Sequence, residues 1–200
     1  MKVLIACEFS GIVREAFAKR GHDAWSWDLL PSEIPGKHIQ GDIRKETRAG
    51  FWNYWDILIA HPPCTYIANS GVRWLFEKKG RWQQLDDACN FFKELLYAPI
   101  PKICIENPLP HKWGIERIGR KYTQKIQPYY FGDKQKKGTC LWLVNLSPLI
   151  PTTPNLKPPK DKEELKKWEM IWRMPPGIDQ KKNRSRTFQG IANAMAEQWG

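Results

Sequence analysis

The sequence predicts an α/β protein with a doubly wound, mainly parallel sheet. Short apolar runs typical of buried strands alternate with helical patterns over roughly a hundred residues of the chain. Each apolar run stops at a turn that carries a polar residue, a glycine or a proline. Sheets of this kind bind ligands in a crevice at the carboxyl ends of their strands. We therefore look for the functional residues at those ends.

The first strand–helix–strand unit covers residues 2–28. Residues 2–7 read as a buried strand, and a helical pattern through residues 13, 16 and 17 follows the turn at 8–11. Gly21 stops this helix, and residues 23–27 form a second strand that ends at Asp28. This order is a βαβ signature.

Three further strands are predicted after this unit. The first, around Ile39, is weak. The second, at 56–60, is the clearest strand of the chain and runs into a proline-rich turn. Apolar residues at positions 82, 85, 89, 92 and 96 predict one buried helical face. A buried strand at 102–106 follows and stops before Pro108.

The second half changes character. Residues 122–131 and 139–144 predict antiparallel strands around a basic turn, and the proline-rich stretch 147–160 predicts a linker. Asp161 is positioned to cap a helix whose apolar side carries Leu165, Trp168 and Trp172, either as a solvated surface helix or in contact with nucleic acid. A basic run at 180–186 precedes a closing helix through residues 191, 195 and 199.

Composition narrows the class of protein. The chain has 200 residues, is 12% aromatic and carries a formal net charge of +11, which favours a folded protein with a polyanionic partner. No apolar run reaches the roughly 18 to 20 residues of a membrane helix, and we expect no membrane association and a cytoplasmic location in a bacterial or phage-infected cell. Five cysteines without paired spacing indicate neither a disulfide framework nor a metal site.

Two strand ends carry candidate catalytic groups. Cys64 follows two prolines that stiffen the loop and hold its thiol at the sheet edge, the position of a nucleophile. The other cysteines lie within apolar patterns, where cysteine packs as a small hydrophobic residue. Glu106 ends the next predicted strand, either as a partner of Cys64 or as a carboxylate that caps a local turn.

With these residues the sequence resembles the S-adenosylmethionine-dependent DNA (cytosine-5) methyltransferases, in a compact phage-type form. The resemblance spans nearly the whole chain, and its proline-proline-cysteine and glutamate-asparagine motifs are its most specific parts. Its motifs, in chain order, are Phe9-Ser10-Gly11, Asp28, Gly41-Asp42-Ile43, Pro62-Pro63-Cys64, Glu106-Asn107-Pro108, Gln135-Lys136-Lys137, and Gly190 with the helix at 192–196.

The resemblance implies a class I methyltransferase fold of the Rossmann-like type that binds S-adenosylmethionine. The 9–11 turn would then hold the methionine part of the cofactor, Asp28 its ribose hydroxyls, and Asp42 its adenine amino group. The cofactor-binding set implied in this way consists of Phe9, Ser10, Gly11, Asp28, Asp42, Ile43 and Pro62.

The resemblance also implies a mechanism. The Cys64 thiolate adds to C6 of cytosine while Glu106 binds N3 and the amino group, so that C5 gains enough charge to attack the sulfonium methyl group. A base then removes the C5 proton, and the thiolate leaves. Lys137 would contact the base as a third catalytic residue. The target base must be flipped out of a duplex or be single-stranded already.

The sequence departs from the family at three points. Val13 and Lys137 stand where a glycine and an arginine are usual, and an asparagine box before the last helix is missing. We divide the chain into a catalytic core (1–145), a small basic Pro/Lys-rich insert in place of the large target-recognition domain (146–185) and a C-terminal helix that returns to the core (186–200).

Little sequence specificity is expected from so small an insert. DNA is the predicted partner, and the alternative for the basic run is a solvated turn. Two other functions stay open: a catalytically degraded relative that binds DNA or S-adenosylmethionine, and a methyltransferase of free pyrimidine nucleotides. The expected nucleic-acid contacts are Gln135, Lys136, Lys181, Lys182, Arg184 and Arg186.

Overall fold

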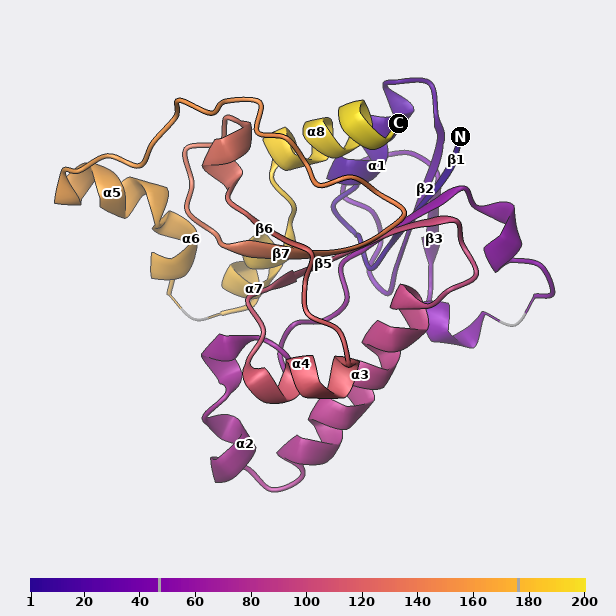
Figure 1. The fold of residues 1–200 in the computed structure, drawn as a ribbon, viewed down its shortest axis with the longest axis horizontal. Helices are drawn as coiled ribbons and strands as arrows, with labels where there is room; N and C mark the ends of the chain where they lie inside the picture. Colours follow the sequence, from indigo (N-terminus) through magenta and orange to yellow (C-terminus); the bar gives the residue numbers. More distant parts are fainter. Residues whose placement is uncertain (47, 176) are drawn as a thin grey trace.

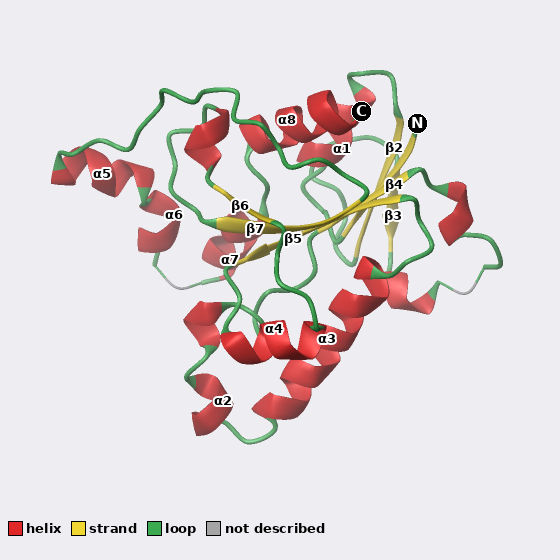
Figure 2. Cartoon of the chain, in the orientation of Figure 1, coloured by secondary structure: helices red, strands yellow, loops and turns green. Residues whose placement is uncertain are grey.

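The computed structural model describes residues 1–46, 48–175 and 177–200. Within these ranges the chain forms a seven-stranded sheet that is covered by helices on both faces (Figures 1 and 2). The strands are β1 (Lys2–Ala6), β2 (Asp23–Asp28), β3 (His38–Gln40), β4 (Ile57–Ala60), β5 (Lys102–Pro108), β6 (Gln124–Ile126) and β7 (Thr139–Val144). The helices are α1 (Ile12–Ala18), α2 (Trp74–Glu77), α3 (Arg81–Leu96), α4 (Lys112–Ile118), α5 (Lys162–Trp168), α6 (Met170–Arg173), α7 (Ile178–Ser185) and α8 (Gln189–Trp199).

The sheet order is β3-β2-β1-β4-β5-β7-β6. Strands β3, β2, β1, β4 and β5 pair in parallel, whereas β7 is antiparallel to both β5 and β6. The strand order reverses between β1 and β4, which is where an open α/β sheet places its ligand crevice. The predicted fold class, a doubly wound, mainly parallel sheet of Rossmann-like type, is confirmed.

Alternate residues of the central strands feed two separate cores. Leu4 and Leu58 face the layer of α3, where Phe92 is fully buried, whereas Ile5 faces α1 and α8, where Met195 is fully buried. This follows from the two-residue repeat of a strand, which sends neighbouring side chains to opposite faces. Because both faces are covered, these strands are apolar at nearly every position, as their sequence indicates.

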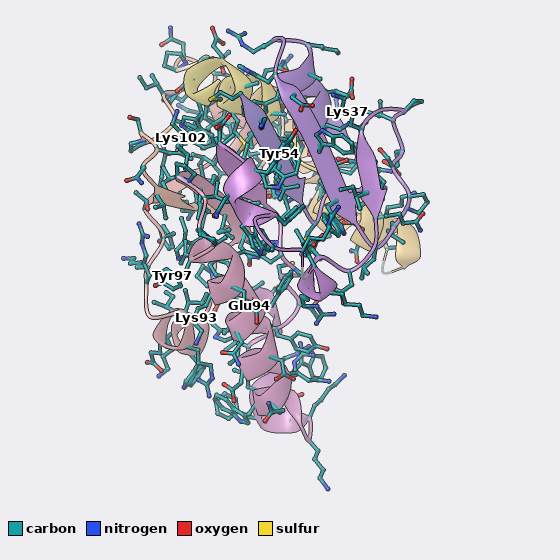
Figure 3. All side chains as sticks on the ribbon, turned by 90° about the vertical axis from the view of Figure 1, so that its right-hand side faces the viewer. Lys37, Tyr54, Lys93, Glu94, Tyr97 and Lys102 are labelled. Atoms are coloured by element: carbon teal, nitrogen blue, oxygen red, sulfur yellow. The ribbon has the colours of Figure 1, made fainter. Side chains whose placement is uncertain are left out.

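Helix α3 lies along one face of the sheet, as its apolar repeat predicts. The four side chains at positions 85, 89, 92 and 96 are buried, and α4 packs beside the helix. Figure 3 shows the opposite, exposed side, where Lys93, Glu94 and Tyr97 project from the carboxyl-terminal part of α3. Tyr54 is labelled in the same view, and the ammonium group of Lys2 in β1 lies 3.8 Å from the centre of its ring.

The structure corrects the expected helix that begins after Asp161. Asp161 does cap α5, accepting a hydrogen bond from the Glu164 backbone N–H, but α5 ends at Trp168 and a separate helix, α6, follows. The Glu169 side chain at this break binds Lys136 and Arg173, which draws the chain toward the turn before β7. The Trp172 side chain lies outside the described residues.

The basic run at 180–186 is not a turn but belongs mostly to α7. Helix α7 has almost no apolar residues, so hydrophobic periodicity gives no signal for it. The sequence patterns also do not predict α2, which has only four residues, or α4.

The proline-rich stretch after β7 is held against the core. Leu149 is buried, and its backbone exchanges two hydrogen bonds with the Gln124 amide, each 2.8 Å long. The Ile150 backbone is bonded in the same way to Gln198 of α8. Across the described ranges, every helix is too short or too polar to span a membrane.

Candidate active site

The predicted site residues gather at the carboxyl ends of β1, β2, β4 and β5. The turn at 8–11 follows β1, Asp28 ends β2, and His61 to Cys64 follow β4. Glu106 lies near the end of β5, one register step beyond the Ala60–Ile105 pair. Because parallel strands end at one edge, residues far apart in the sequence meet there.

The turn after β1 is organised by a buried carboxylate, Glu8, to which the sequence patterns assign no role. Its side chain accepts hydrogen bonds from the backbone N–H groups of Val13, at 2.7 Å, and Arg14, at 3.2 Å. Burial raises the pKa of Glu8, and this effect outweighs the lowering that the two hydrogen bonds cause. Gly11 has φ +73°, and a β-carbon on it would lie 2.7 Å from the Arg14 guanidinium. A glycine is therefore required at this position.

Arg14 is a second residue that the sequence patterns do not single out. Its fully buried guanidinium donates to the Ser26 and Ser32 hydroxyls, both at 3.0 Å, and to the Ile34 carbonyl at 2.7 Å. It thereby fixes the loop after β2 to α1. The available signal was its position on α1, because Arg14 precedes the buried Phe17 by three residues and shares its inward face.

The two aspartates predicted to bind the cofactor have different surroundings. Asp28 accepts a hydrogen bond from the Leu30 N–H at 2.9 Å, and burial raises the pKa of its carboxyl. Asp42 begins the short helix at Ile43–Lys45, and both of its oxygens bind the Arg44 guanidinium. This hydrogen bonding lowers the pKa of Asp42. A ligand amino group at Asp42 would therefore share the carboxylate with Arg44.

The structure brings the predicted catalytic residues, Cys64, Glu106 and Lys137, within electrostatic range of one another. Burial raises the pKa of the Cys64 thiol, and the charge of Lys137 partly offsets that rise. Burial also acts to raise the pKa of Glu106, but the hydrogen bond from His61 and the charge of Lys137 outweigh it and hold that pKa below its ordinary value. The site therefore contains a protonated thiol beside an ionised carboxylate.

His61 is a third residue to which the sequence patterns assign no role. Its Nδ1 lies 2.7 Å from Glu106 Oε2, and both side chains are less than a tenth exposed. The neighbouring Asn107 donates to the Pro62 carbonyl at 3.0 Å and so ties β5 to the proline turn. The position of a histidine directly after a buried strand, at the edge where other motif residues gather, was the signal for it.

Lys137 is also bound to α7. Its buried ammonium group donates to the carbonyl of Arg184 at 2.5 Å and to that of Arg186 at 3.5 Å. Carbonyls at the end of a helix lack partners within the helix, so a lysine is well suited to bind them. Helix α7 is in this way fixed over the predicted catalytic edge.

A second contact, here called the latch, joins α7 to the loop after β2 and consists of Glu33, Lys182 and Arg186. Glu33 binds Lys182 at 2.7 Å and Arg186 at 2.7 and 2.8 Å. Both cations also lie over the Phe9 ring. Hydrogen bonding to Arg186, followed by that to Lys182, lowers the pKa of Glu33 to about 2.

These contacts bear on the residues predicted to bind nucleic acid. Lys136 binds Glu169 at 2.9 Å, and the Gln135 amide donates to the Lys167 carbonyl at 3.2 Å. Lys182 and Arg186 hold the latch, and the charge of Arg184 acts on Cys64. The Lys181 side chain lies outside the described residues. Their DNA contacts remain a prediction, but four of these side chains already have partners within the chain.

The latch should contribute stability that depends on pH. Glu33→Gln removes both ion pairs, and we expect about 1 kcal/mol lower free energy of unfolding at pH 7. Because the pKa of Glu33 is lowered in the folded protein, the difference from the wild type is complete above pH 4.5 and shrinks as the pH falls toward 2. Urea unfolding at pH 7, 4.5 and 3.5 measures it.

The exposed Glu163→Gln serves as a matched control, because Glu163 forms only a local ion pair with Lys166. It should change stability by a few tenths of a kcal/mol at most. A Glu33→Gln difference that stays constant from pH 7 to 3.5 would show that the latch does not act through charge.

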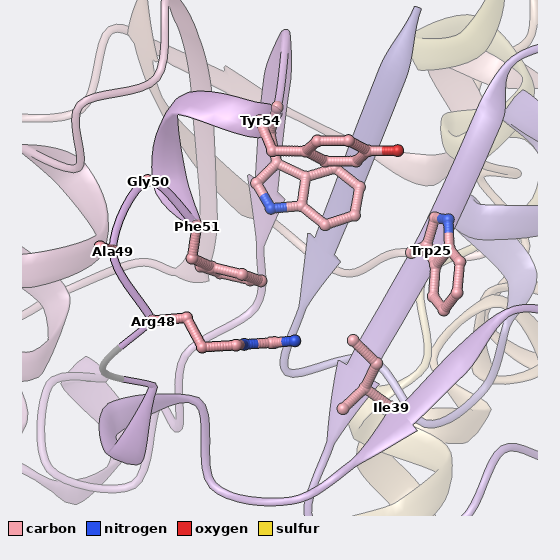
Figure 4. A pocket seen from close by; sticks show the side chains of 8 residues that line it. Trp25, Ile39, Arg48, Ala49, Gly50, Phe51 and Tyr54 are labelled. Carbon is pink, nitrogen blue, oxygen red and sulfur yellow. The ribbon is translucent and has the colours of Figure 1, made fainter.

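Two surface hollows flank the site. One, of about 440 Å³, lies between Ile12 at the start of α1 and residues of α6 and α7, beside the 9–11 turn. The other, of about 420 Å³, lies against β2 and β3. There Arg48 reaches toward Ile39, and Phe51 and Tyr54 face Trp25 (Figure 4). Neither is lined by Cys64 or Glu106.

Comparisons with protein-family models and with curated proteins find no match. Among solved structures, a DNA modification methyltransferase encoded within an E. coli prophage is similar with a TM-score of 0.46 and 14% identity, over 70% of this chain and 45% of that chain. The Entamoeba histolytica methyltransferase EhMeth is similar with a TM-score of 0.39 and 16% identity, over 74% and 53%. The chain thus spans about half the length of each, and the likeness concerns the fold alone.

Proposed function

We propose that this protein transfers a methyl group from S-adenosylmethionine to C5 of cytosine in DNA, with little sequence specificity. The observation that carries the proposal is that Cys64 after β4 and Glu106 on the neighbouring strand β5 lie at one edge of the sheet, where the charge of Lys137 acts on both. A nucleophile, an anionic hydrogen-bond acceptor and a cation within range of one another are the groups that addition to a cytosine ring requires.

The residues around the edge fit the cofactor by charge and by shape. S-adenosylmethionine supplies an electrophilic methyl group on a cationic sulfur. Glu106 provides negative charge, Glu8 and Asp28 place two further carboxyl groups at adjoining strand ends, and Gly11 leaves the turn free of a side chain. We assign the cofactor to the turn at 9–11, with Asp28 at its ribose and Asp42 and Ile43 at its adenine. Pro62 completes the proposed cofactor-binding set.

Three of the chain's own residues act in this proposal. Cys64 loses its proton to solvent and forms the Sγ–C6 bond, which moves the C5–C6 electron pair to C5. That pair would form the bond from C5 to the methyl group while the bond from the methyl group to the sulfonium sulfur breaks. Glu106 accepts from the base amino group, and Lys137 stabilises the negative charge that develops on the adduct. After methylation a base takes the C5 proton, the electron pair returns to the ring, and the Sγ–C6 bond breaks.

Covalent trapping tests the proposal directly. DNA that contains 5-fluorocytosine should form a complex that survives denaturing electrophoresis when S-adenosylmethionine is present, because fluorine cannot leave C5 as a proton. If cofactor and DNA both bind but no complex forms, the cytosine-5 proposal fails and the binding-only relative stands.

The DNA contacts assigned to α7 predict a salt dependence. The charge of +11 supports phosphate binding, and residues 146–185 take the place of a recognition domain in this proposal. Binding to unrelated duplexes should weaken with salt to a similar degree, by a slope of about 0.9 per phosphate contact.

The cofactor assignment predicts a loss of affinity at both aspartates. Asp28→Asn and Asp42→Asn should each weaken S-adenosylmethionine binding by about 1 to 3 kcal/mol, because each leaves a ligand donor without its charged acceptor. Isothermal titration measures the loss, and DNA affinity should not change. Asp23→Asn, at the opposite end of β2, is the matched control. Unchanged affinity in both variants would refute this placement of the cofactor.

A further inference from the structure

His61 is held in the site by contacts on both sides. Its backbone N–H donates to the Ala6 carbonyl of β1 at 2.9 Å, and its ring meets Glu106 of β5. The side chain is 7% exposed. An imidazole in this place cannot turn into solvent, so both of its nitrogens must be accounted for inside the protein.

The Glu106 contact determines which nitrogen carries the proton. The pKa of Glu106 is held below its ordinary value, so its carboxylate is ionised and can only accept a hydrogen bond. Nδ1 at 2.7 Å must therefore be the donor. In the neutral ring Nε2 is then an acceptor. In the doubly protonated ring it would be a second buried N–H without an acceptor, which is costly.

Nε2 is buried and has no hydrogen-bond partner among the residues that the structure describes. Buried polar atoms are nearly always paired, so an unpaired one at a ligand crevice indicates a group that arrives with the ligand. The charged groups around the ring are mainly acidic. The carboxyl groups of Glu8 and Asp28 lie within electrostatic range of the ring, and Lys137 acts on Glu106 from the side of β7.

From this arrangement we infer that His61 Nε2 accepts a hydrogen bond from an amino group of the bound ligand. An acceptor nitrogen among carboxylates suits an N–H donor and disfavours a carbonyl. The inference rests on the proposed function for the identity of that ligand. Two groups have this chemistry: the α-ammonium group of S-adenosylmethionine and the exocyclic amino group of cytosine. The experiment distinguishes them.

The tautomer is tested on the free protein and needs no activity. Nitrogen-15 NMR of the imidazole at pH 8, with His61→Asn to assign the signals, should show a proton on Nδ1 and none on Nε2. A proton on Nε2 overturns the inference, whatever the protein does with DNA.

The ligand contact is tested with two substitutions. His61→Asn keeps an amide near the position of Nδ1, and so the bond to Glu106, but has no atom at Nε2. His61→Gln reaches the Nε2 position with an amide oxygen that accepts. We expect His61→Asn to weaken the binding of one of the two ligands at least tenfold, and His61→Gln to recover most of the lost affinity. His22→Asn, at the opposite end of the sheet, is the control.

The probes separate the two sources. If Nε2 binds the cofactor, His61→Asn weakens S-adenosylhomocysteine but not 5′-methylthioadenosine, which lacks the amino acid part. If Nε2 binds the base, His61→Asn lowers the binding preference for a single-stranded oligonucleotide with one cytosine over the same strand with uracil by at least tenfold. No change in either measurement overturns the inference. Covalent trapping on 5-fluorocytosine DNA could fail while His61→Asn still weakens binding of S-adenosylhomocysteine but not of 5′-methylthioadenosine. That result would overturn only the proposed function.

Discussion

Cys64→Ala is expected to abolish methyl transfer and to leave cofactor binding intact. In the proposed mechanism the thiol attacks the base and is the only group that can form the Sγ–C6 bond, so turnover should fall by at least about 10³-fold. A tritiated-methyl assay on DNA measures turnover, and isothermal titration measures S-adenosylmethionine affinity, which should stay within a factor of two or so of the wild type.

The matched control is Cys104→Ala. Cys104 lies on the same strand as Glu106, is fully buried and faces the core formed with α1 and α8. Its loss removes a thiol of the same size and should cost about 1 kcal/mol of stability without abolishing turnover. Turnover retained in Cys64→Ala, or lost equally in both variants, would remove Cys64 from the mechanism.

Glu106→Gln is expected to lower kcat by about 10²- to 10³-fold, the usual loss when one electrostatic contact to a developing charge is removed. Glutamine preserves the volume and can still accept from His61 Nδ1, so the fold should be retained. Because the pKa of Glu106 is held below its ordinary value, the carboxylate is ionised at pH 6 and at pH 8. The loss should therefore be the same at both values.

Glu116→Gln on the exposed side of α4 provides the comparison, and its kcat should not change. A loss in Glu106→Gln that appears only as a higher KM would assign Glu106 to substrate binding alone. A loss that is larger at pH 6 than at pH 8 would show that the protonated carboxyl, rather than the carboxylate, is the working form.

The sequence by itself determined the strands and the edge at which function is to be sought. Runs such as 57–60 are apolar at every position because parallel strands are buried on both faces. Strand ends in a parallel sheet meet at one edge, and so the chain order of strands and turns is enough to group Asp28, Cys64 and Glu106. Helix α3 was equally predictable, because its sixteen residues show a full apolar repeat.

Only the tertiary structure decided how the charged residues pair. Glu33 meets Arg186 across 153 positions of the chain and His61 meets Glu106 across 45, distances at which no local pattern carries information. The same holds for α7, whose sequence has almost no apolar residues and which is fixed by Lys137 and Glu33 from other elements. An apolar pattern shows which face of one strand or helix is buried, and it can be read from the sequence because it repeats within that element. Ion pairs and buried hydrogen bonds depend on which single side chains the fold brings together.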